Sequence, residues 1–377
     1  MFGKGIKIFT LLGFEVRLDP SWFLVALLVT WSLAVYVFPG MTGELAAATY
    51  WIMGVAGALG LFLSIILHEL GHALVARRQG IEIGGITLFI FGGVAQLNEE
   101  PKTARDEFFM AMGGPVVSVG LAFLFYAAGL SLAALEGPAA VSAVLIYLGA
   151  INGIVVLFNM VPAFPLDGGR VLRAALWGWK KDLRSATRIA SRLGAAFGLI
   201  LIGLGVVELF LGSVVSGFWL ILLGLFLRAA AASSFQQVML RESLRGEPVR
   251  AFMSADPIVV HPAMTVRELI DDYIYTHHHK LYPVMDDGEL KGCVTLKQVK
   301  EVPREERDRR TVGEIAVHCD GKNTIQAEAD AVDALSRMSS QQLGRLIVFD
   351  QDRVVGILSM KDLQRFFALK VDLAEAR

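Results

Sequence analysis

Long stretches without charged side chains constrain the fold of this chain more than any other feature. Three of them contain no Asp, Glu, Lys or Arg, and two more contain a single glutamate each; they lie at 20–43, 108–135, 137–166, 45–76 and 193–227. A helix rises about 1.5 Å per residue, so about 20 apolar residues cross the roughly 30 Å hydrocarbon layer of a bilayer. We therefore expect six membrane-spanning helices, at about 21–38, 47–77, 108–134, 140–161, 187–210 and 214–233.

The composition supports a membrane protein and argues against nucleic acid as a partner. Hydrophobic residues make up 54% of the 377 residues and charged residues only 19%, which is too apolar for a wholly soluble chain. The net charge is -1, so no overall positive field would attract nucleic acid.

The basic residues near the ends of the expected spans are distributed unevenly. The segments before the first span, between the second and third, and between the fourth and fifth carry the Lys and Arg residues, whereas 39–46, 135–139 and 211–213 carry none. Positively charged loops stay on the cytoplasmic side. We therefore expect a multi-pass protein of the cell membrane, in contact with the lipid bilayer and with both termini in the cytoplasm.

After Arg241 the sequence changes to the pattern of a soluble α/β domain. A short strand, a helix, two strands and a helix occur once and then recur, so that about 60 residues form an internal repeat. We expect four regions: a six-span membrane domain at 1–235, a linker at 236–250, a first repeat at 251–305 and a second at 306–377.

The second expected span contains two histidines and a glutamate within one turn. His68 and His72 are four residues apart and share a helical face, so both imidazoles can reach one zinc ion. Glu69 is adjacent and can accept a proton from a water molecule at the metal. The alternative is a hydrogen-bonded pair of core histidines, but three ionisable groups in a bilayer are costly without a metal or a water-filled cavity.

A catalytic zinc site needs a third protein ligand and an open position. The other histidines lie in the soluble tail, and the intramembrane candidate is Asp167, which follows prolines and precedes glycines at the end of the fourth span. Such a helix break must line a cavity rather than face lipid. The alternatives are that Asp167 caps the next helix or pairs with Arg170.

These residues together resemble the site-2 protease family of intramembrane zinc metalloproteases. The resemblance rests on His68-Glu69-x-x-His72 in one span and Asn159-x-x-Pro162 followed by Leu166-Asp167-Gly168 in another, with Gly113-Gly114-Pro115 between them. It implies that His68, His72 and Asp167 bind one zinc ion per chain and that Glu69 is the general base. It also implies that Asn159 contacts the substrate backbone or the developing oxyanion.

The segment between the second and third spans is also relevant to substrate binding. Apolar β-formers from Ile83 to Leu97 are interrupted by pairs of glycines, a pattern that predicts a hairpin. Phe91, Gly92, Gly93 and Val94 stand where the family has a membrane-associated β segment. An exposed strand edge there could capture an unwound substrate by β-addition. The alternative is a hairpin that only plugs the zinc cavity.

The repeat resembles a pair of cystathionine-β-synthase (CBS) domains, which are cytosolic sensors of adenine nucleotides. In the second copy Ser359 and Asp362 match the family's phosphate-facing hydroxyl and ribose-binding carboxylate. In the first copy Thr295 matches the hydroxyl, but Gln298 replaces the aspartate. The resemblance implies that ATP, ADP or AMP binds as a regulator, mainly to the second copy, and that two chains could form a homodimer through the CBS pair. The alternative is a purely structural or dimerising pair.

Taken together, the sequence predicts an α-helical polytopic membrane domain with six transmembrane helices and a soluble α/β tandem CBS domain. The predicted function is that of an intramembrane zinc endopeptidase that performs regulated intramembrane proteolysis. Its substrate would be a single-span membrane protein, either an anti-sigma factor or a membrane-tethered transcription-regulator precursor. The competing hypothesis is a CBS-regulated membrane transporter or channel, which leaves the zinc motif unexplained.

Overall fold

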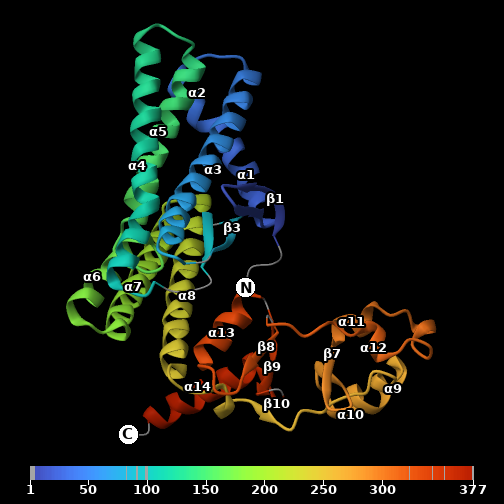
Figure 1. Cartoon of the computed structure of the whole chain (residues 1–377). Coiled ribbons are helices and arrows are strands. Elements are labelled where there is room, and N and C mark those ends of the chain that lie inside the picture. The colour runs from blue at the N-terminus through green and yellow to red at the C-terminus, as the bar shows by residue number, and fades with distance from the viewer. Residues whose placement is uncertain are drawn as a thin grey trace. The chain divides into compact units, whose positions relative to one another are not determined.

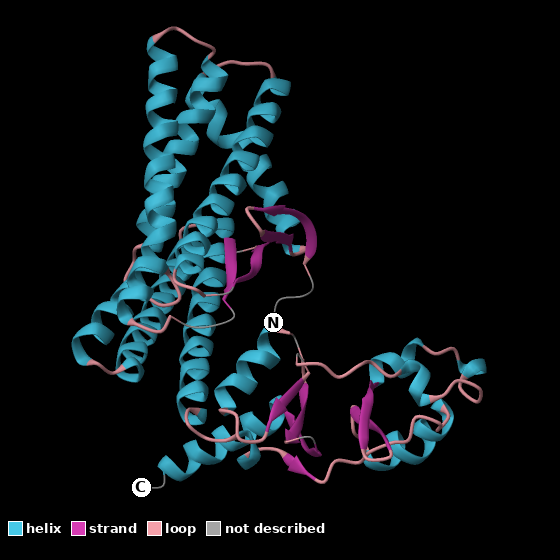
Figure 2. Ribbon diagram, in the orientation of Figure 1, coloured by secondary structure: helices cyan, strands magenta, loops and turns pink. Residues whose placement is uncertain are grey.

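The computed structural model describes residues 5–375 except 82, 91, 98–100, 322, 342 and 352, and it describes the backbone but not the side chains of 94–97 and 370–375. The chain divides into two compact units, Met1–Val238 and Met239–Arg377. The first unit is mainly helical and the second combines helices with small sheets (Figures 1 and 2). Each unit is described here by itself.

Six helical segments of the described chain are long and apolar enough to span a membrane, as the sequence predicts. They are Ser21–Thr42, Ala47–Arg78, Ala104–Ala134, Ala139–Asn159, Leu183–Phe210 and Val214–Leu244. The first consists of α1 (Ser21–Ser32), a π-helical turn (Leu33–Val37) and α2 (Phe38–Thr42), and the others are α3, α4, α5, α7 and α8. α4 packs against both α3 and α5 in the same bundle (Figure 1).

The ends of these helices follow from local sequence. Thr103 caps α4, because its side chain accepts a hydrogen bond from the backbone N–H of Asp106. Asp182 caps α7 in the same way by accepting from the N–H of Ser185. α3 ends at Arg77 and Arg78, whose positive charges suit the negative end of a helix dipole.

A four-stranded sheet belongs to the same unit, with the strand order β1-β2-β3-β4. β3 (Ile83–Phe89) and β4 (Gly92–Leu97) pair in antiparallel fashion and form the predicted hairpin. A second hairpin, β1 (Ile6–Leu11) and β2 (Phe14–Leu18), extends the sheet through a parallel pairing of β2 with β3. Our sequence analysis missed it, although a turn at Leu12 and Gly13, both with positive φ, separates two β-rich runs.

A shorter helix, α6 (Asp167–Lys180), lies between α5 and α7 in sequence and is not one of the candidate spans. A buried ion pair attaches it to α4: Arg173 donates from Nε to Glu107 Oε1 over 2.6 Å. Glu107 is fully buried and Arg173 is 3% exposed, so this pair is shielded from water. The guanidinium also lies 5.0 Å from the centre of the Phe164 ring.

The second unit contains the two predicted repeats. The first has α9 (Val266–Glu268), a π-helical segment (Leu269–Ile274), α10 (Tyr275–His277), β6 (Leu281–Asp286), β7 (Glu289–Thr295) and α11 (Leu296–Glu301). Short helical turns at Arg304–Glu306 and α12 (Val312–Ile315) follow, and the second repeat has β8 (Thr324–Gln326), α13 (Ala331–Ser340), β9 (Arg345–Asp350), β10 (Arg353–Ser359) and α14 (Met360–Glu375). Thr265 is the N-cap of α9 and forms a capping box with Glu268.

The two repeats exchange strands. β5 (Ser254–Ala255) lies at the start of the first repeat but pairs with β10 of the second, and Val317 lies near the start of the second repeat but forms a bridge with Cys293 of the first. The stretch predicted to be a linker also contributes to a core. Residues up to Leu244 are helical, and Leu244 and Val249 are buried against the second repeat.

Candidate metal centre

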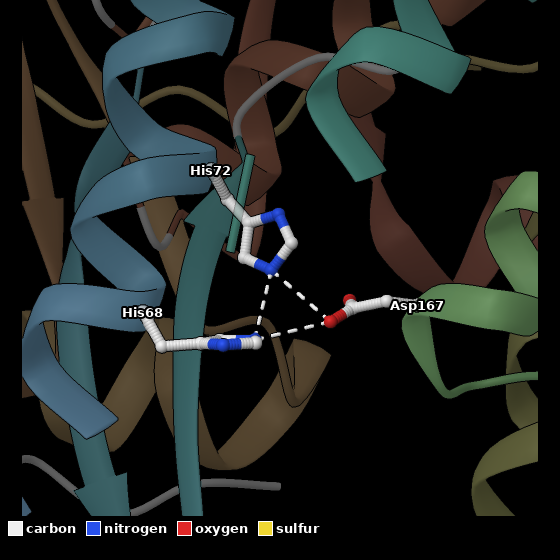
Figure 3. A group of neighbouring side chains, drawn as sticks. All are labelled: His68, His72 and Asp167. Atoms are coloured by element: carbon white, nitrogen blue, oxygen red, sulfur yellow. Dashed lines mark hydrogen bonds and ion pairs between the residues drawn. The ribbon is translucent and has the colours of Figure 1, made fainter. Parts of the chain in front are cut away.

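Three side chains that are far apart in the sequence converge in the membrane unit. His68 and His72 project from α3, and Asp167 is the first residue of α6 (Figure 3). His68 Nε2 lies 3.2 Å from His72 Nε2, and Asp167 Oδ2 lies 3.0 Å from the former and 3.3 Å from the latter. These are the predicted ligands, and they form the one group of three potential metal-binding side chains found among the described residues.

The size of this triangle suits a tetrahedral metal ion. With bonds of about 2.0–2.1 Å to zinc, neighbouring ligand atoms of a tetrahedron are about 3.3 Å apart. The three observed separations, 3.0, 3.2 and 3.3 Å, are close to that value. Three protein ligands leave the fourth position open, which is the arrangement of catalytic rather than structural zinc sites.

Hydrogen bonds to the outer ring nitrogens orient both imidazoles. His72 Nδ1 lies 2.7 Å from the carbonyl oxygen of Met110, which can only accept, so Nδ1 carries a proton, and in the neutral imidazole Nε2 presents a lone pair. The Gly114 N–H lies 3.3 Å from the same Nδ1, but a nitrogen that donates to Met110 cannot also accept. His68 Nδ1 lies 2.8 Å from Ser118 Oγ, which is fully buried on α4.

With neutral imidazoles, the triangle is unfavourable unless a cation occupies it. The Nε2 lone pair of His72 and the carboxylate oxygen of Asp167 are both acceptors, and acceptors cannot hydrogen bond to one another. All three side chains are largely removed from solvent, so water cannot separate them. The donor set of two imidazoles and one carboxylate therefore fits a zinc ion.

Glycines allow the backbone to approach the ligands closely. A Cβ on Gly114 of α4 would overlap Nε2 of both His68 and His72, so no larger residue fits at this point of the helix. The motif Gly113-Gly114-Pro115 therefore has a direct steric explanation. On the other side, a Cβ on Gly168 would collide with the backbone of Met160, in the loop that leads from α5 to Asp167.

The metal-binding triangle borders a cavity of about 530 Å³. Most of the wall is apolar and includes Phe89, Phe158 and Phe226. The polar residues of the wall are His68, Glu69, His72, Asn159, Asp167, Arg170 and Ser234. Few polar groups in an apolar cavity are typical of a site that binds and orients a substrate.

Glu69 and Asn159, the two predicted catalytic residues outside the triangle, both line this cavity. Glu69 lies against β4, because a Cβ on Gly93 would come within 2.6 Å of Glu69 Cγ. Asn159 is the last residue of α5. Within the described part of the chain neither side chain has a hydrogen-bonding partner.

The alternatives considered for Asp167 differ from its observed contacts. The N-cap of α6 is Leu166, which forms no side-chain capping hydrogen bond, and Asp167 faces the histidines. No ion pair joins Asp167 to Arg170 among the described residues. Of the hairpin residues, Gly92 and Gly93 border the cavity, the side chain of Val94 is not described, and Phe91 lies outside the described residues.

The predicted nucleotide-binding residues lie in the second unit. Ser359 Oγ donates to Asp362 Oδ2 over 2.5 Å, and the Ser359 N–H donates to the same oxygen over 2.9 Å. Thr295 and Gln298 form the corresponding capping box at the start of α11. In this structure both pairs therefore serve as helix caps.

These features together are those of a membrane metalloprotease: six candidate spans, a hairpin beside a helix, and a cavity with two histidines and a carboxylate. The match to known proteins agrees with this class. The model of peptidase family M50 matches residues 56–136 and 132–201, and the CBS domain model matches 249–305 and 313–369.

Similar proteins cover nearly the whole chain. A protein of Mycobacterium tuberculosis named "Putative zinc metalloprotease Rip3" is 37% identical over 357 residues, which are 94% of this chain and 90% of that protein. "Putative zinc metalloprotease sll0528" of Synechocystis is 33% identical over 362 residues, 94% of this chain and 93% of that one. The solved site-2 protease from Methanocaldococcus jannaschii is 28% identical and covers 61% of this chain and 94% of its own, with a TM-score of 0.41.

The chain therefore belongs to peptidase family M50. It is a multi-pass membrane zinc metalloprotease of the site-2 protease type with a tandem CBS domain, as the sequence predicts.

Proposed function

We propose that this protein cleaves a peptide bond within the membrane span of a single-span membrane protein and thereby releases a cytosolic fragment. The triangle of His68, His72 and Asp167, at the border of a mainly apolar cavity, is the observation that carries this proposal. A released cytosolic fragment suits a signalling substrate. The substrate class we propose is an anti-sigma factor or a membrane-tethered precursor of a transcription regulator.

The residues of the cavity have separate roles in this reaction. His68, His72 and Asp167 would hold one zinc ion, which when bound polarises the substrate carbonyl and lowers the pKa of water. Glu69 accepts a proton from the attacking water and delivers it to the leaving amine. Asn159 donates from its side-chain amide to the carbonyl oxygen, where negative charge develops. The apolar wall excludes other water and accommodates the side chains of a membrane span.

A helical substrate must unwind locally before its peptide bonds are accessible. β4 is an edge strand of its sheet and lies against Glu69. We propose that the unwound segment pairs with β4 along Phe91, Gly92, Gly93 and Val94, which would present its backbone to the cavity. Gly92 and Gly93 have no side chains to obstruct this approach.

The same proposal includes an orientation and a form of regulation. The distribution of basic residues supports a cell-membrane protein with both termini in the cytoplasm, so the CBS pair would meet cytosolic nucleotides. We propose that an adenine nucleotide binds near Ser359 and Asp362, with a weaker contribution from Thr295, and changes the rate of cleavage. A homodimer through the CBS pair belongs to the same hypothesis.

The proposal can be tested by reconstituting the full chain with a model single-span substrate. The native protein should cleave the substrate, and Glu69→Gln should abolish cleavage while zinc stays bound, because the amide cannot accept a proton and Glu69 is not a ligand. Asp182→Ala, which removes a helix cap outside the cavity, is the matched control and should keep cleaving. Loss of zinc from Glu69→Gln, or turnover by this variant, would contradict the assignment.

A further inference from the structure

Two arginines one turn apart on α6 have different surroundings. Arg173 is buried and neutralised by Glu107. Arg170 is only partly exposed and lines the cavity that contains the metal-binding triangle. Its guanidinium forms no hydrogen bond and no ion pair with any residue that the structure describes. A partly buried cation without a partner is costly, so the partner of Arg170 should come with a ligand.

Arg170 is a neighbour, on the same helix, of one of the proposed metal ligands. It follows Asp167 by three residues, and side chains three apart on a helix are neighbours, with about 5–6 Å between their Cβ atoms. Asp167 nevertheless faces His68 and His72. Arg170 and the proposed metal ligand Asp167 therefore line the same cavity from neighbouring positions of one helix, and the guanidinium is not used by Asp167.

The charges of the cavity indicate what kind of ligand is missing. Besides the two histidines, the acidic and basic side chains of its wall are those of Glu69, Asp167 and Arg170. A divalent ion at the triangle would balance the two carboxylates, which leaves one positive charge at Arg170. A substrate peptide bond is neutral, whereas its carbonyl oxygen gains one negative charge when water adds to it.

We propose that Arg170 binds the oxygen that becomes negatively charged during cleavage and then the carboxylate of the product. This inference rests on the proposed proteolytic function. When water adds, a C–O bond forms, the carbonyl π electrons move to the oxygen beside Arg170, and Glu69 receives the proton. The C–N bond then breaks and the amine leaves with that proton. Glu69 takes the remaining hydroxyl proton from the new carboxylic acid and passes it to the amine, which becomes an ammonium group, and the new C-terminal carboxylate stays paired with the guanidinium.

Asn159 and Arg170 differ in what they supply. The Asn159 amide is a neutral donor, whereas a guanidinium adds a full positive charge and two parallel N–H groups that match a carboxylate. Lysine at 170 would keep the charge and lose the paired geometry. Glutamine would keep a donor and lose the charge.

The first test measures cleavage kinetics and zinc content for Arg170→Gln and Arg170→Lys in the full-length protein. Loss of an oxyanion-stabilising donor costs about 10²–10³ in kcat, so we expect this loss in Arg170→Gln, a smaller loss in Arg170→Lys, and unchanged zinc in both. Arg188→Gln is the control, because Arg188 is exposed on α7 and does not line the cavity. Added guanidinium ion should restore part of the activity of Arg170→Ala, which a purely structural defect would not allow.

The second test does not depend on turnover. Two peptides with the sequence of the N-terminal product are compared, one ending in a carboxylate and the other in a carboxamide. The native protein should bind the carboxylate at least about tenfold more tightly, and Arg170→Gln should bind both equally. This arm separates failure of the proteolytic proposal, in which the native protein cleaves nothing, from failure of the assignment of Arg170.

Three results would overturn the assignment. One is a native protein that binds both peptides equally. Another is an Arg170→Gln variant that keeps native kcat or the carboxylate preference. The third is a defect of Arg170→Gln that appears only in vesicles of anionic lipid and not in neutral micelles, which would assign the guanidinium to lipid headgroups instead.

Discussion

The membrane unit and the CBS unit use similar polar residues, but in different surroundings. In the membrane unit His68 and His72 are buried and face a carboxylate, and their outer nitrogens are held by Ser118 and Met110. In the CBS unit Ser359 and Asp362 are partly exposed and bond to each other at the start of a helix. A buried polar group needs a specific partner, whereas water can satisfy an exposed one. The same residue types therefore indicate function more strongly in the membrane unit.

The largest effect should come from removing a ligand in the membrane unit. Asp167→Ala takes one of three donors from the triangle and leaves two nitrogen lone pairs facing a cavity. We expect zinc affinity to fall by more than the roughly 10–100-fold that losing a hydrogen-bond partner of a ligand costs, and cleavage to stop. Competition with a chelator of known affinity measures this change. Native affinity and stoichiometry would reduce Asp167 to a structural residue.

The next prediction concerns the buried ion pair that holds α6 to α4. Glu107→Ala leaves Arg173 charged and buried, which should cost about 3–5 kcal/mol of stability. Replacing both residues by leucine removes both charges and should be far less harmful. Thermal unfolding in micelles compares these variants with Arg105→Ala, a matched exposed control on the same helix. If the single and double variants unfold alike, the pair does not stabilise the fold.

A smaller effect, on the cleavage rate, is expected if β4 is the edge strand that binds the substrate. Val94→Pro should remove about one backbone hydrogen bond to the captured segment, or ~1 kcal/mol, and slow cleavage about fivefold with zinc retained. Phe91→Pro tests the same edge outside the described residues. The control is Ile8→Pro in β1, the other edge strand, at a point where the pairing register shifts. Normal cleavage by both β4 variants would leave the hairpin as a plug of the cavity.

Much of the membrane unit could be predicted because its signals are periodic or steric. Charge-free runs predicted the six spans, and β-rich residues between glycine pairs predicted the hairpin of β3 and β4. The spacing of His68 and His72 predicts that both side chains lie on one helical face, and their Nε2 atoms are found close together (Figure 3). The helix break at the end of the fourth span already made Asp167 the candidate third ligand, and the family resemblance supported it, because no periodic pattern runs through the loop from Asn159 to Asp167.

Features that depend on distant residues were not predictable in this way. Glu107 and Arg173 are 66 positions apart, and their pairing follows from the packing of α4 against α6. In the sequence, Arg173 is one of several basic residues between the fourth and fifth spans, and nothing there indicates that it is buried. The exchange of β5 and Val317 between the CBS copies also has no local signal, since each segment pairs outside its own repeat.

The smallest expected change in stability comes from the two capping boxes of the CBS unit. Asp362→Ala and Gln298→Ala each remove the third-position side chain that completes a capping box and leave the N-cap residue in place, so each should cost about 0.5–1.5 kcal/mol of local stability. Only Asp362 offers a charged acceptor for ribose hydroxyls, so only its loss should abolish a nucleotide response. Comparison of the two variants therefore distinguishes loss of nucleotide binding from loss of a helix-capping interaction.

The measurement is the cleavage rate of the native chain and both variants against ATP, ADP and AMP. A regulatory coupling of about 1–3 kcal/mol would change the native rate several-fold to about a hundredfold, provided the nucleotide binds the two conformations differently. Asp362→Ala should be unresponsive, and Gln298→Ala should respond almost normally because its amide makes a weaker, neutral contact. If no nucleotide binds at millimolar concentration, or if both variants respond alike, Ser359 and Asp362 act only as a helix cap and the CBS pair is a structural or docking module.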